Sequence, residues 1–362
     1  MAYPKRRKQK PKIFFLVGPT AIGKSRTAIQ LAQKLDAEII SLDSMQVYRG
    51  LDILSSKPTR DMLKKVRHHL LDSVRPEDEF DAAAYRRLAV RKINEIHRKG
   101  KIPLFAGGTG LYMNVVINGI FKDAGKDESL REKLSTQIKT KGSRFLYNKL
   151  KRIDALAASK IHPHDARRII RALEVYRLTG RPISALWNKR SGLSDKYEIK
   201  LFGLNRDRER LYNDIDRRVD EMFAQAVVDE VKGLLRRKLS RSSGQAIGLK
   251  EIGGYLDGDY DLECAKELMK KNTRNYAKRQ LTWFRKDKRI QWINIDRENV
   301  IERIISGPAG NLPKPVRQCL PARPAGGPAG RQGAASNSRS HKPEGNGAAS
   351  NSRSHKPRGA NE

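Results

Sequence analysis

The chain has 362 residues, enough for one large domain or two ordinary domains with a buried core. Its 75 Lys and Arg residues against 40 Asp and Glu residues give a formal net charge of +35. Only +7 of this charge, from ten basic and three acidic residues, lies beyond residue 300. An excess spread through the folded part predicts a polyanionic partner larger than a nucleotide, with general solubility as the alternative.

Cysteine content and hydropathy argue against a disulfide-rich, zinc-binding, secreted or membrane protein. Cys264 and Cys319 are far apart and have no C-x-x-C spacing, so they predict neither a disulfide framework nor a zinc site. The apolar run 13–17 is too short for a secretory signal, and no run of 18 apolar residues occurs. We therefore expect a soluble, cytoplasmic protein that does not enter a membrane.

The first third of the sequence alternates between predicted strands and helices. Residues 1–12 carry six basic and no acidic side chains, which indicates a basic arm. The predicted elements that follow are strand 13–17, helix 24–35, strand 38–42, a helix within 81–98 and strand 102–106. This alternation is typical of an α/β fold, in which crossover helices join parallel strands and flank the sheet.

The rest of the sequence divides into three parts. Residues 121–197 are mostly helical in pattern and strongly charged, which indicates a helical insertion domain. Strand 197–204, helices over about 207–238, 244–257 and 262–287, and strand 290–295 then complete the core. We expect 12–120 and 198–300 to form this core. Residues 306–362, with GAASNSRSHKP at 333–343 and again at 347–357, predict a disordered low-complexity tail.

The run GPTAIGKS at 18–25 is the most informative motif, because it lies between an apolar strand and an amphipathic helix. Its two glycines permit a tight turn, and its backbone N–H groups attract anionic oxygens. Lys24 adds a positive charge, and the Ser25 hydroxyl can ligate Mg²⁺. The sequence thus predicts a P-loop-containing parallel sheet.

Two polar residues follow strands that should end beside this loop. Asp43 follows strand 38–42, and Thr109 follows strand 102–106 within AGGTGLY. Ligands of open parallel sheets bind outside the carboxyl ends of the strands, so both residues are expected at the cleft. On the residues alone, Asp43 can hold a metal, accept a proton from a nucleophile or cap a turn.

Basic side chains recur at helical spacing in two segments. Arg167, Arg168 and Arg171 lie on one predicted helix. One face of the last long helix carries Lys271, Arg274, Lys278 and Arg285. Such charges fit either a solvated helix face or a surface that binds a polyanion.

Taken together, eight motifs resemble the tRNA dimethylallyltransferase family, also called tRNA isopentenyl transferases. They are GPTAIGKS at 18–25, DSMQVYRGLDI at 43–53, SKP at 56–58, HHLLD at 68–72, AGGTGLY at 106–112, HPHDARRIIRALEV at 162–175, QAIGLKE at 245–251 and KRQLTWFR at 278–285. The resemblance spans about residues 12–295. It is to the bacterial type, because the cysteines cannot form the zinc finger of eukaryotic members.

The resemblance implies transfer of a dimethylallyl group from dimethylallyl diphosphate to the exocyclic amine of the adenosine next to the anticodon, with Mg²⁺ and release of diphosphate. It implies that Asp43 is the general base and that Thr109 helps to place the amine. The implied diphosphate-binding residues are Gly18, Pro19, Thr20, Ala21, Ile22, Gly23, Lys24, Ser25 and Arg218, with Ser25 also holding the metal. Those implied to bind the tRNA anticodon stem-loop are Asp43, Ser44, Met45, Gln46, Arg131, Arg167, Arg168, Ile169, Ile170, Arg171, Lys278, Arg279, Gln280 and Arg285.

The chain departs from the family pattern at a few positions. Leu54 and Ser55 replace the usual Gly-Thr, Asp214 stands where arginine is common, and Leu249 is often tyrosine. Three other classes share a phosphate-binding loop and stay open as alternatives: a transferase acting on free adenine nucleotide, an ATP-binding P-loop kinase, and an RNA-binding nucleoside triphosphatase. We expect a monomer.

Overall fold

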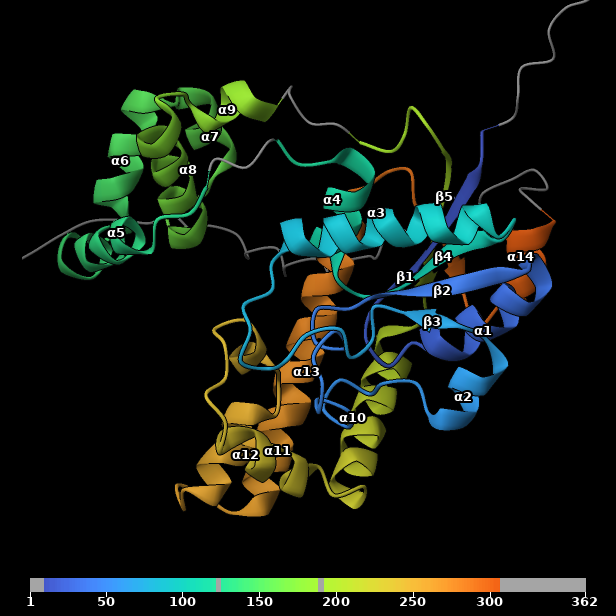
Figure 1. The fold of residues 1–362 in the computed structure, drawn as a ribbon. Coiled ribbons are helices and arrows are strands. Elements are labelled where there is room, and N and C mark those ends of the chain that lie inside the picture. Colours follow the sequence, from blue (N-terminus) through green and yellow to red (C-terminus); the bar gives the residue numbers. More distant parts are fainter. Residues whose placement is uncertain (1–9, 122–124, 188–191, 307–362) are drawn as a thin grey trace, which may run out of the picture. The chain divides into compact units, whose positions relative to one another are not determined.

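The computed structural model describes residues 10–121, 125–187 and 192–306 (Figure 1). The chain divides into two units, 1–310 and 311–362, and every described residue belongs to the first. Most of the expected basic arm, nearly all of the expected tail and Cys319 lie outside the described residues.

Within the described residues, six strands form one parallel sheet in the order β3-β2-β4-β1-β5-β6. The strands are β1 Lys12–Val17, β2 Ala37–Leu42, β3 His68–His69, β4 Ile102–Gly107, β5 Glu198–Asn205 and β6 Gln291–Asn294. β1 lies at the centre, between β4 and β5. Its run Ile13–Val17 is buried on both faces, which is why the sequence is continuously apolar there rather than alternating.

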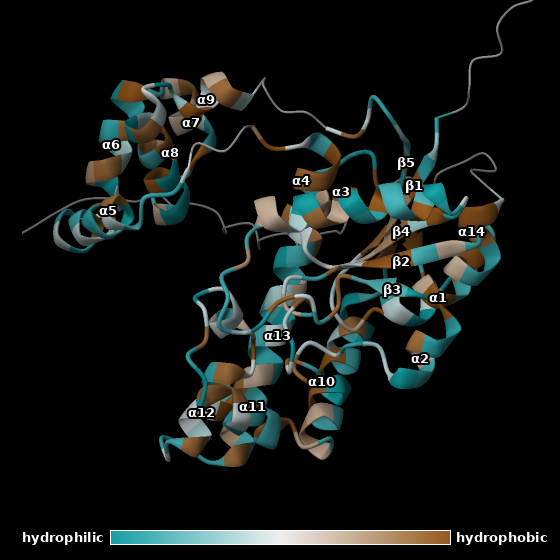
Figure 2. Cartoon of the chain, viewed as in Figure 1, coloured by the Kyte–Doolittle hydropathy of each residue, from teal (hydrophilic) through white to brown (hydrophobic). Residues whose placement is uncertain are grey.

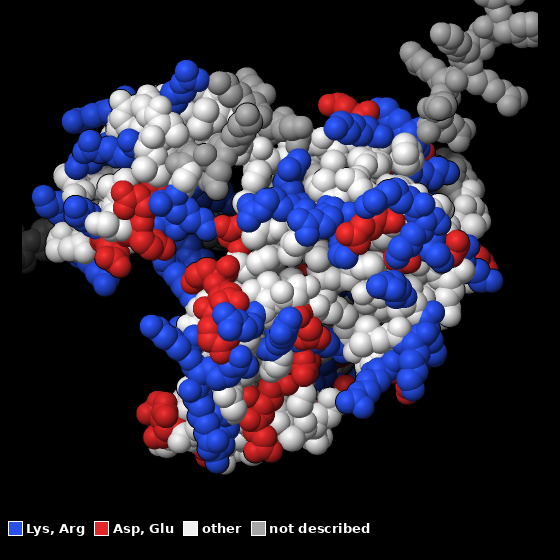
Figure 3. Space-filling model, in the orientation of Figure 1, with Lys and Arg blue, Asp and Glu red and all other residues white. Residues whose placement is uncertain are grey.

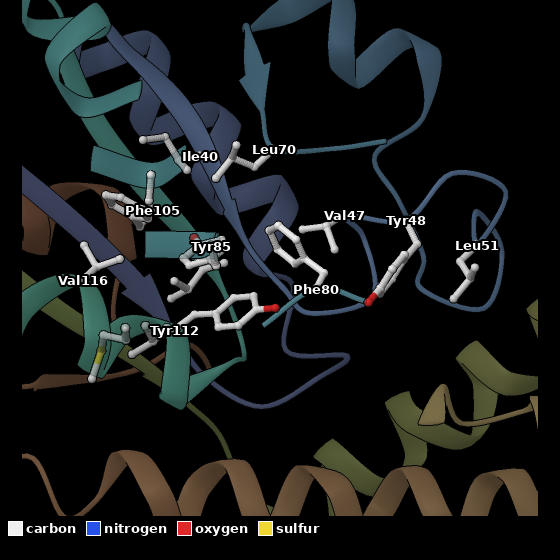
Figure 4. Packing of buried hydrophobic residues seen from close by; sticks show 14 of the residues in the cluster. Ile40, Val47, Tyr48, Leu51, Leu70, Phe80, Tyr85, Phe105, Tyr112 and Val116 are labelled. Atoms are coloured by element: carbon white, nitrogen blue, oxygen red, sulfur yellow. The ribbon is translucent and has the colours of Figure 1, made fainter. Parts of the chain in front are cut away.

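Helices cover both faces of this sheet, and their apolar sides form two separate clusters (Figures 1 and 2). The helices near the strands are α1 Lys24–Leu35, α2 Arg60–Lys65, α3 Ala82–Arg98, α4 Gly110–Asn118 and α14 Val300–Ile305. On one face, Tyr85 of α3 stacks on Tyr112 of α4 with ring centroids 3.9 Å apart, beside Phe105 of β4 (Figure 4). Apolar residues of α1 and α14 pack on the other face.

Residues 128–186 form a set of helices with its own apolar cluster, as the sequence predicted for the insertion. They are α5 Glu128–Lys141, α6 Ser143–Ile153, α7 Ala155–Lys160, α8 Ala166–Thr179 and α9 Ile183–Leu186. Leu146 of α6 and Ile169 of α8 are completely buried in this cluster. That the segment acts as a separate domain stays a prediction.

The second part of the core is built from α10 Arg208–Ala224, α11 Val227–Leu235, α12 Leu249–Leu256 and α13 Leu262–Phe284. The single helix expected over 207–238 is wrong, because Ala226 adopts a left-handed backbone (φ 63°) that separates α10 from α11. A short 3₁₀ turn, Ser243–Gln245, precedes α12. Of the helices in the described part of the chain, none is both long enough and apolar enough to cross a membrane. The predicted fold class, an α/β parallel sheet with flanking helices, is confirmed.

Candidate active site

The loop 18–25 joins the end of β1 to the start of α1, as its motif predicts. Gly18 has a φ of +154°, and a Cβ on it would lie 2.9 Å from the backbone oxygen of Leu204 on β5. Gly23 has a φ of +83° and caps α1 without a side chain. The first N–H groups of α1 therefore have no side-chain cap and can bind an anion.

Lys24 is held inside this loop. Its Nζ donates to the backbone oxygen of Pro19 at 2.6 Å. Burial and, to a smaller extent, the nearby Arg218 guanidinium lower the pKa of Lys24 to about 7, against the opposite effect of the Asp43 carboxylate. A bound anion would offset both lowering effects, so the loop favours a negatively charged ligand.

Arg218 reaches the same loop from α10. Its Nη1 donates to Thr20 Oγ1 at 3.3 Å, and its Nε donates to Ser56 Oγ at 2.8 Å. Burial lowers the pKa of this arginine, whereas the charge of Asp43 raises it. The diphosphate-binding residues named from the sequence are thus together, although Arg218 lies almost 200 residues after the loop.

Asp43 and Thr109 follow the neighbouring strands β2 and β4 and meet at their carboxyl ends. Asp43 Oδ1 accepts from the backbone N–H of Met45 at 2.8 Å. Thr109 Oγ1 accepts from the backbone N–H of Ser44 at 3.1 Å, and its own N–H donates to the oxygen of Leu42 at 3.0 Å. The Asp43 and Thr109 side chains are therefore both held by the backbone of the short segment 44–45.

Glycines at the end of β4 allow α13 to approach closely. A Cβ on Gly108 would lie 2.0 Å from Gln280 Nε2, and one on Gly110 would lie 2.1 Å from Trp283 Cδ1. Tyr276 of the same helix reaches Thr109, and burial followed by the charge of Asp43 raises the pKa of this tyrosine well above its ordinary value. The AGGTGLY motif is thus a contact surface for α13 as well as a turn.

The side chain of Gln280, which the sequence assigns to tRNA binding, lies inside the fold. It is buried, accepts from the Thr20 N–H at 2.8 Å and donates to the Gly108 oxygen at 3.0 Å. These bonds join the phosphate-binding loop to the end of β4. Its amide therefore supports the site from inside the fold, and its assignment to tRNA binding stays a prediction.

Of the expected tRNA contacts on α5 and α8, Arg167 and Arg168 are exposed, and Arg167 Nη2 donates to Gln245 Oε1 at 3.2 Å. Ile169 is completely buried, so its side chain belongs to the apolar cluster, and the assignment of this residue to tRNA binding stays a prediction. Ile170 is half-buried and packs on the same apolar cluster.

Arg131 and Arg171, also expected to bind tRNA, bind a buried carboxylate. Arg131 donates to both oxygens of Glu174, from Nε at 2.8 Å and from Nη2 at 3.1 Å. Arg171 Nη1 donates to Glu174 Oε2 at 2.7 Å and to the oxygen of Gly125. These arginines neutralise Glu174 and tie α5, α8 and the segment before α5 together. This pairing could not be predicted from the sequence, because Arg131 and Glu174 are 43 residues apart and nothing in the pattern of basic residues identifies such a distant partner.

Lys278 and Arg279 of α13 and Arg285, which caps the end of this helix, are exposed, as a polyanion-binding surface requires. Arg274, on the expected basic face, instead donates to both oxygens of Asp216 on α10 at 2.6 Å. On the face of the molecule seen in Figure 3, Lys and Arg side chains are spread over several helices with acidic residues between them. On this face the positive charge is thus distributed, not gathered in a single patch.

The departures from the family pattern have local explanations. Leu54 is buried and lies against Gly248, where a Cβ would come 2.3 Å from Leu54 Cδ2. Asp214 pairs with Arg206 and, at 2.5 Å, with Arg217. Leu249 is a buried core residue. Within the described part of the chain, Asp214 therefore hydrogen bonds to two arginines and not to the phosphate-binding loop.

The fold and this site define a P-loop α/β protein with an acid and a hydroxyl at adjacent strand ends. The chain belongs to the IPP transferase family, whose sequence profile matches residues 46–287. It is 44% identical to a tRNA dimethylallyltransferase of Geobacter sulfurreducens over 78% of this chain and 92% of that protein. It is also 44% identical to a tRNA dimethylallyltransferase of Acetivibrio thermocellus, over 81% and 95%.

Solved structures agree with this assignment. The full-length tRNA isopentenylpyrophosphate transferase of Bacillus halodurans is 42% identical, with a TM-score of 0.59 over 82% of this chain and 94% of that one. A eukaryotic dimethylallyltransferase acting on tRNA is 31% identical, with a TM-score of 0.65 over 78% and 74%.

Proposed function

We propose that this chain transfers a dimethylallyl group from dimethylallyl diphosphate to the exocyclic amine of the adenosine adjacent to the anticodon in tRNA, releasing diphosphate. The observation that carries the proposal is the meeting of a phosphate-binding loop, Asp43 and Thr109 at the ends of β1, β2 and β4. Membership of the IPP transferase family and relatives named tRNA dimethylallyltransferase support it.

The diphosphate of the donor is assigned to the loop 18–25 and Arg218. As the allylic C–O bond breaks, its electron pair stays on the departing diphosphate. Lys24 and Arg218 would stabilise that developing charge, and the N–H groups at the start of α1 would add to the effect. Because an adenine amine is a weak nucleophile, this stabilisation is expected to be the largest contribution to catalysis.

Asp43 is assigned as the general base. As the new C–N bond forms, the amine must lose one proton, and the carboxylate of Asp43 would accept it. The Met45 N–H holds one carboxylate oxygen, which fixes the orientation of the group. Thr109, tied to the Ser44 N–H, would position the amine beside it.

The residues present fit a divalent cation at Ser25. Within the described residues no three His, Cys, Asp or Glu side chains gather as a metal site, so the protein alone would not encase a metal. Mg²⁺ commonly takes one or two protein oxygens and fills its shell with phosphate oxygens and water, as a half-buried Ser25 hydroxyl allows. Bound there, Mg²⁺ would neutralise charge on the diphosphate.

The tRNA anticodon stem-loop is assigned to exposed basic residues of two helices. Arg167 and Arg168 belong to α8, in the 121–197 segment that we assign to tRNA binding. Lys278 and Arg279 belong to α13, and Arg285 caps its end. This helix contacts Thr109 through Tyr276. One chain supplies every assigned residue, so we expect a monomer, acting in the cytoplasm where tRNA is available.

The test is an assay of the purified protein with Mg²⁺, using tRNA or adenosine monophosphate as acceptor and dimethylallyl diphosphate or ATP as donor. We expect mass spectrometry of digested tRNA to show one dimethylallyl group on one adenosine, formed without ATP. Transfer to adenosine monophosphate but not tRNA would favour the free-nucleotide transferase. Phosphate transfer from ATP would favour a kinase.

A further inference from the structure

Ser56 lies outside the loop 18–25 and has no role in the site as assigned above. Its hydroxyl nevertheless accepts from Nε of Arg218 at 2.8 Å. We propose that Ser56 is a positioning residue that sets the orientation of the Arg218 guanidinium toward the phosphate-binding loop. This inference rests on the proposed function, since it assumes that Arg218 binds the donor diphosphate.

The backbone of Ser56 is in an unusual conformation. Its φ is +47°, in the left-handed region that residues other than glycine, asparagine and aspartate seldom adopt. Such conformations persist where the surroundings impose them, and they cluster at functional sites. The conformation aims the Ser56 hydroxyl at Arg218, so the strained residue and the buried cation belong together.

Three neighbouring contacts impose that conformation. The Ser56 N–H donates to the oxygen of Ile53 at 2.9 Å. The side-chain amide of Gln46 donates to the oxygens of Ser55 at 3.2 Å and Ser56 at 3.3 Å. Gln46 also donates its backbone N–H to Asp43 Oδ1 at 3.4 Å, so the same residue touches the proposed base and the segment that holds Arg218.

The segments on both sides of Ser56 are anchored as well. The carboxylate of Glu230 on α11 accepts from the N–H groups of Asp52 at 3.0 Å and Ile53 at 2.8 Å, and also from that of Leu54. Lys57 is largely buried and donates to Tyr48 O and to Asp52, both at 2.6 Å. Ser56 is thus presented by a segment fixed at both ends, which is what a positioning role requires.

Two anchors define the plane of the Arg218 guanidinium. Nε is bound to Ser56, and Nη1 is bound to Thr20 at 3.3 Å. Thr20 belongs to the phosphate-binding loop, and a diphosphate would compete for that contact. Ser56 does not belong to the loop, so its bond can persist when the donor binds and keep the guanidinium in place.

The test compares Ser56→Ala with a matched control, Ser55→Ala. The Ser55 hydroxyl donates to the backbone oxygen of Leu51, whereas the Ser56 hydroxyl accepts from Arg218. We expect Ser56→Ala to raise both the KM for dimethylallyl diphosphate and the Kd for inorganic diphosphate with Mg²⁺ about tenfold, the loss typical of a hydrogen bond to a charged group. The KM for tRNA and the melting temperature should stay at the wild-type values, and Ser55→Ala should resemble the wild type throughout.

A double-mutant cycle separates positioning from a general weakening of the segment. In an Arg218→Ala background, Ser56→Ala should change the diphosphate Kd no further. Equal diphosphate affinity in Ser56→Ala and Ser55→Ala, or full additivity with Arg218→Ala, would overturn the inference. Failure of the proposed function has a different signature: the wild type would transfer no dimethylallyl group, whatever the serine variants do to diphosphate binding.

Discussion

Asp43 is the residue on which the proposed chemistry depends most directly. Replacing it with Ala should lower kcat by about 10²- to 10⁴-fold, the range for loss of a general base. The KM values for donor and tRNA should change much less, because neither the loop 18–25 nor the basic helices lose a contact. Steady-state kinetics at saturating tRNA measure the loss of kcat. Asp43→Asn keeps the acceptor for the Met45 N–H and should lose a similar factor, and a normal kcat in either variant would remove Asp43 from the mechanism.

Lys24 predicts a pH dependence for donor binding. Its pKa in the free protein is about 7, lowered by burial and by Arg218, so the side chain is mostly neutral at about pH 8. A bound diphosphate favours the charged form and raises this pKa, so binding takes up a proton above neutral pH. Affinity for diphosphate should therefore fall as the pH rises from 7.

Calorimetric titration with diphosphate, in buffers that differ in ionisation enthalpy, measures the proton uptake that accompanies binding. The apparent binding enthalpy at about pH 8 should depend on the buffer in the wild type. It should depend on the buffer much less in Lys24→Met, whose side chain is unbranched and only one atom shorter but cannot titrate. A buffer-independent enthalpy in the wild type would contradict the lowered pKa of Lys24.

At the scale of elements, the buried carboxylate of Glu174 holds α5 and α8 together through Arg131 and Arg171. Replacing Glu174 with Gln removes the buried counter-charge that two arginines share and should destabilise the protein by about 3 kcal/mol. Urea unfolding measures the loss. Glu128→Gln is the matched control on α5, because its side chain is 66% exposed and its 3.7 Å pair with Arg131 should contribute little.

The same carboxylate should make this part of the molecule sensitive to acid. Hydrogen bonds from Arg131 and Arg171 lower the pKa of Glu174 against the opposing effect of burial. A lowered pKa in the folded state means that the stabilisation is present above the pKa of the unfolded chain and is lost as the pH falls through the folded value. The difference in stability between the wild type and Glu174→Gln should therefore shrink in acid, and a constant difference would contradict the assignment.

The elements differ in how well the sequence predicted them. β1 and α1 were predictable because five apolar residues mark the strand, and the long phosphate-binding motif after them marks where the strand ends and the helix begins. The strand β3 has only His68 and His69, too short for any periodicity, and α4 begins at Gly110, the last of three glycines that indicate a turn. The break at Ala226 was not predictable, since alanine favours helices and only tertiary packing imposes its left-handed backbone.

The residues of the candidate active site were also only partly predictable from the sequence. Asp43 and Thr109 could be placed together because neighbouring parallel strands end at the same edge of a sheet. Gln280 could not be recognised as a brace for Thr20, because the approach of α13 to the loop depends on contacts 260 residues apart. Ile169 was included with the arginines around it, although its apolar side chain fits the buried face of α8.

At the scale of the whole molecule, positive charge could bind tRNA in two places: the exposed basic residues of the helices, or the residues beyond Ser306, which lie outside the described residues. Each phosphate contact contributes about 0.7–0.9 to the slope of the logarithm of tRNA affinity against the logarithm of salt concentration. Replacing Lys278, Arg279 and Arg285 with Ala should therefore flatten the slope by that amount for each lost contact. Arg274 is not included, because it is paired with Asp216.

Truncation after Ser306 should leave the slope nearly unchanged if the folded part holds the tRNA. Filter binding or fluorescence anisotropy over a range of salt concentrations gives the slope for each variant. A second control, Arg26→Ala on α1, removes one exposed charge that is assigned no role and should keep the wild-type slope. A flattened slope on truncation, with no change in the triple variant, would assign the tRNA contacts to the C-terminal residues instead of α13.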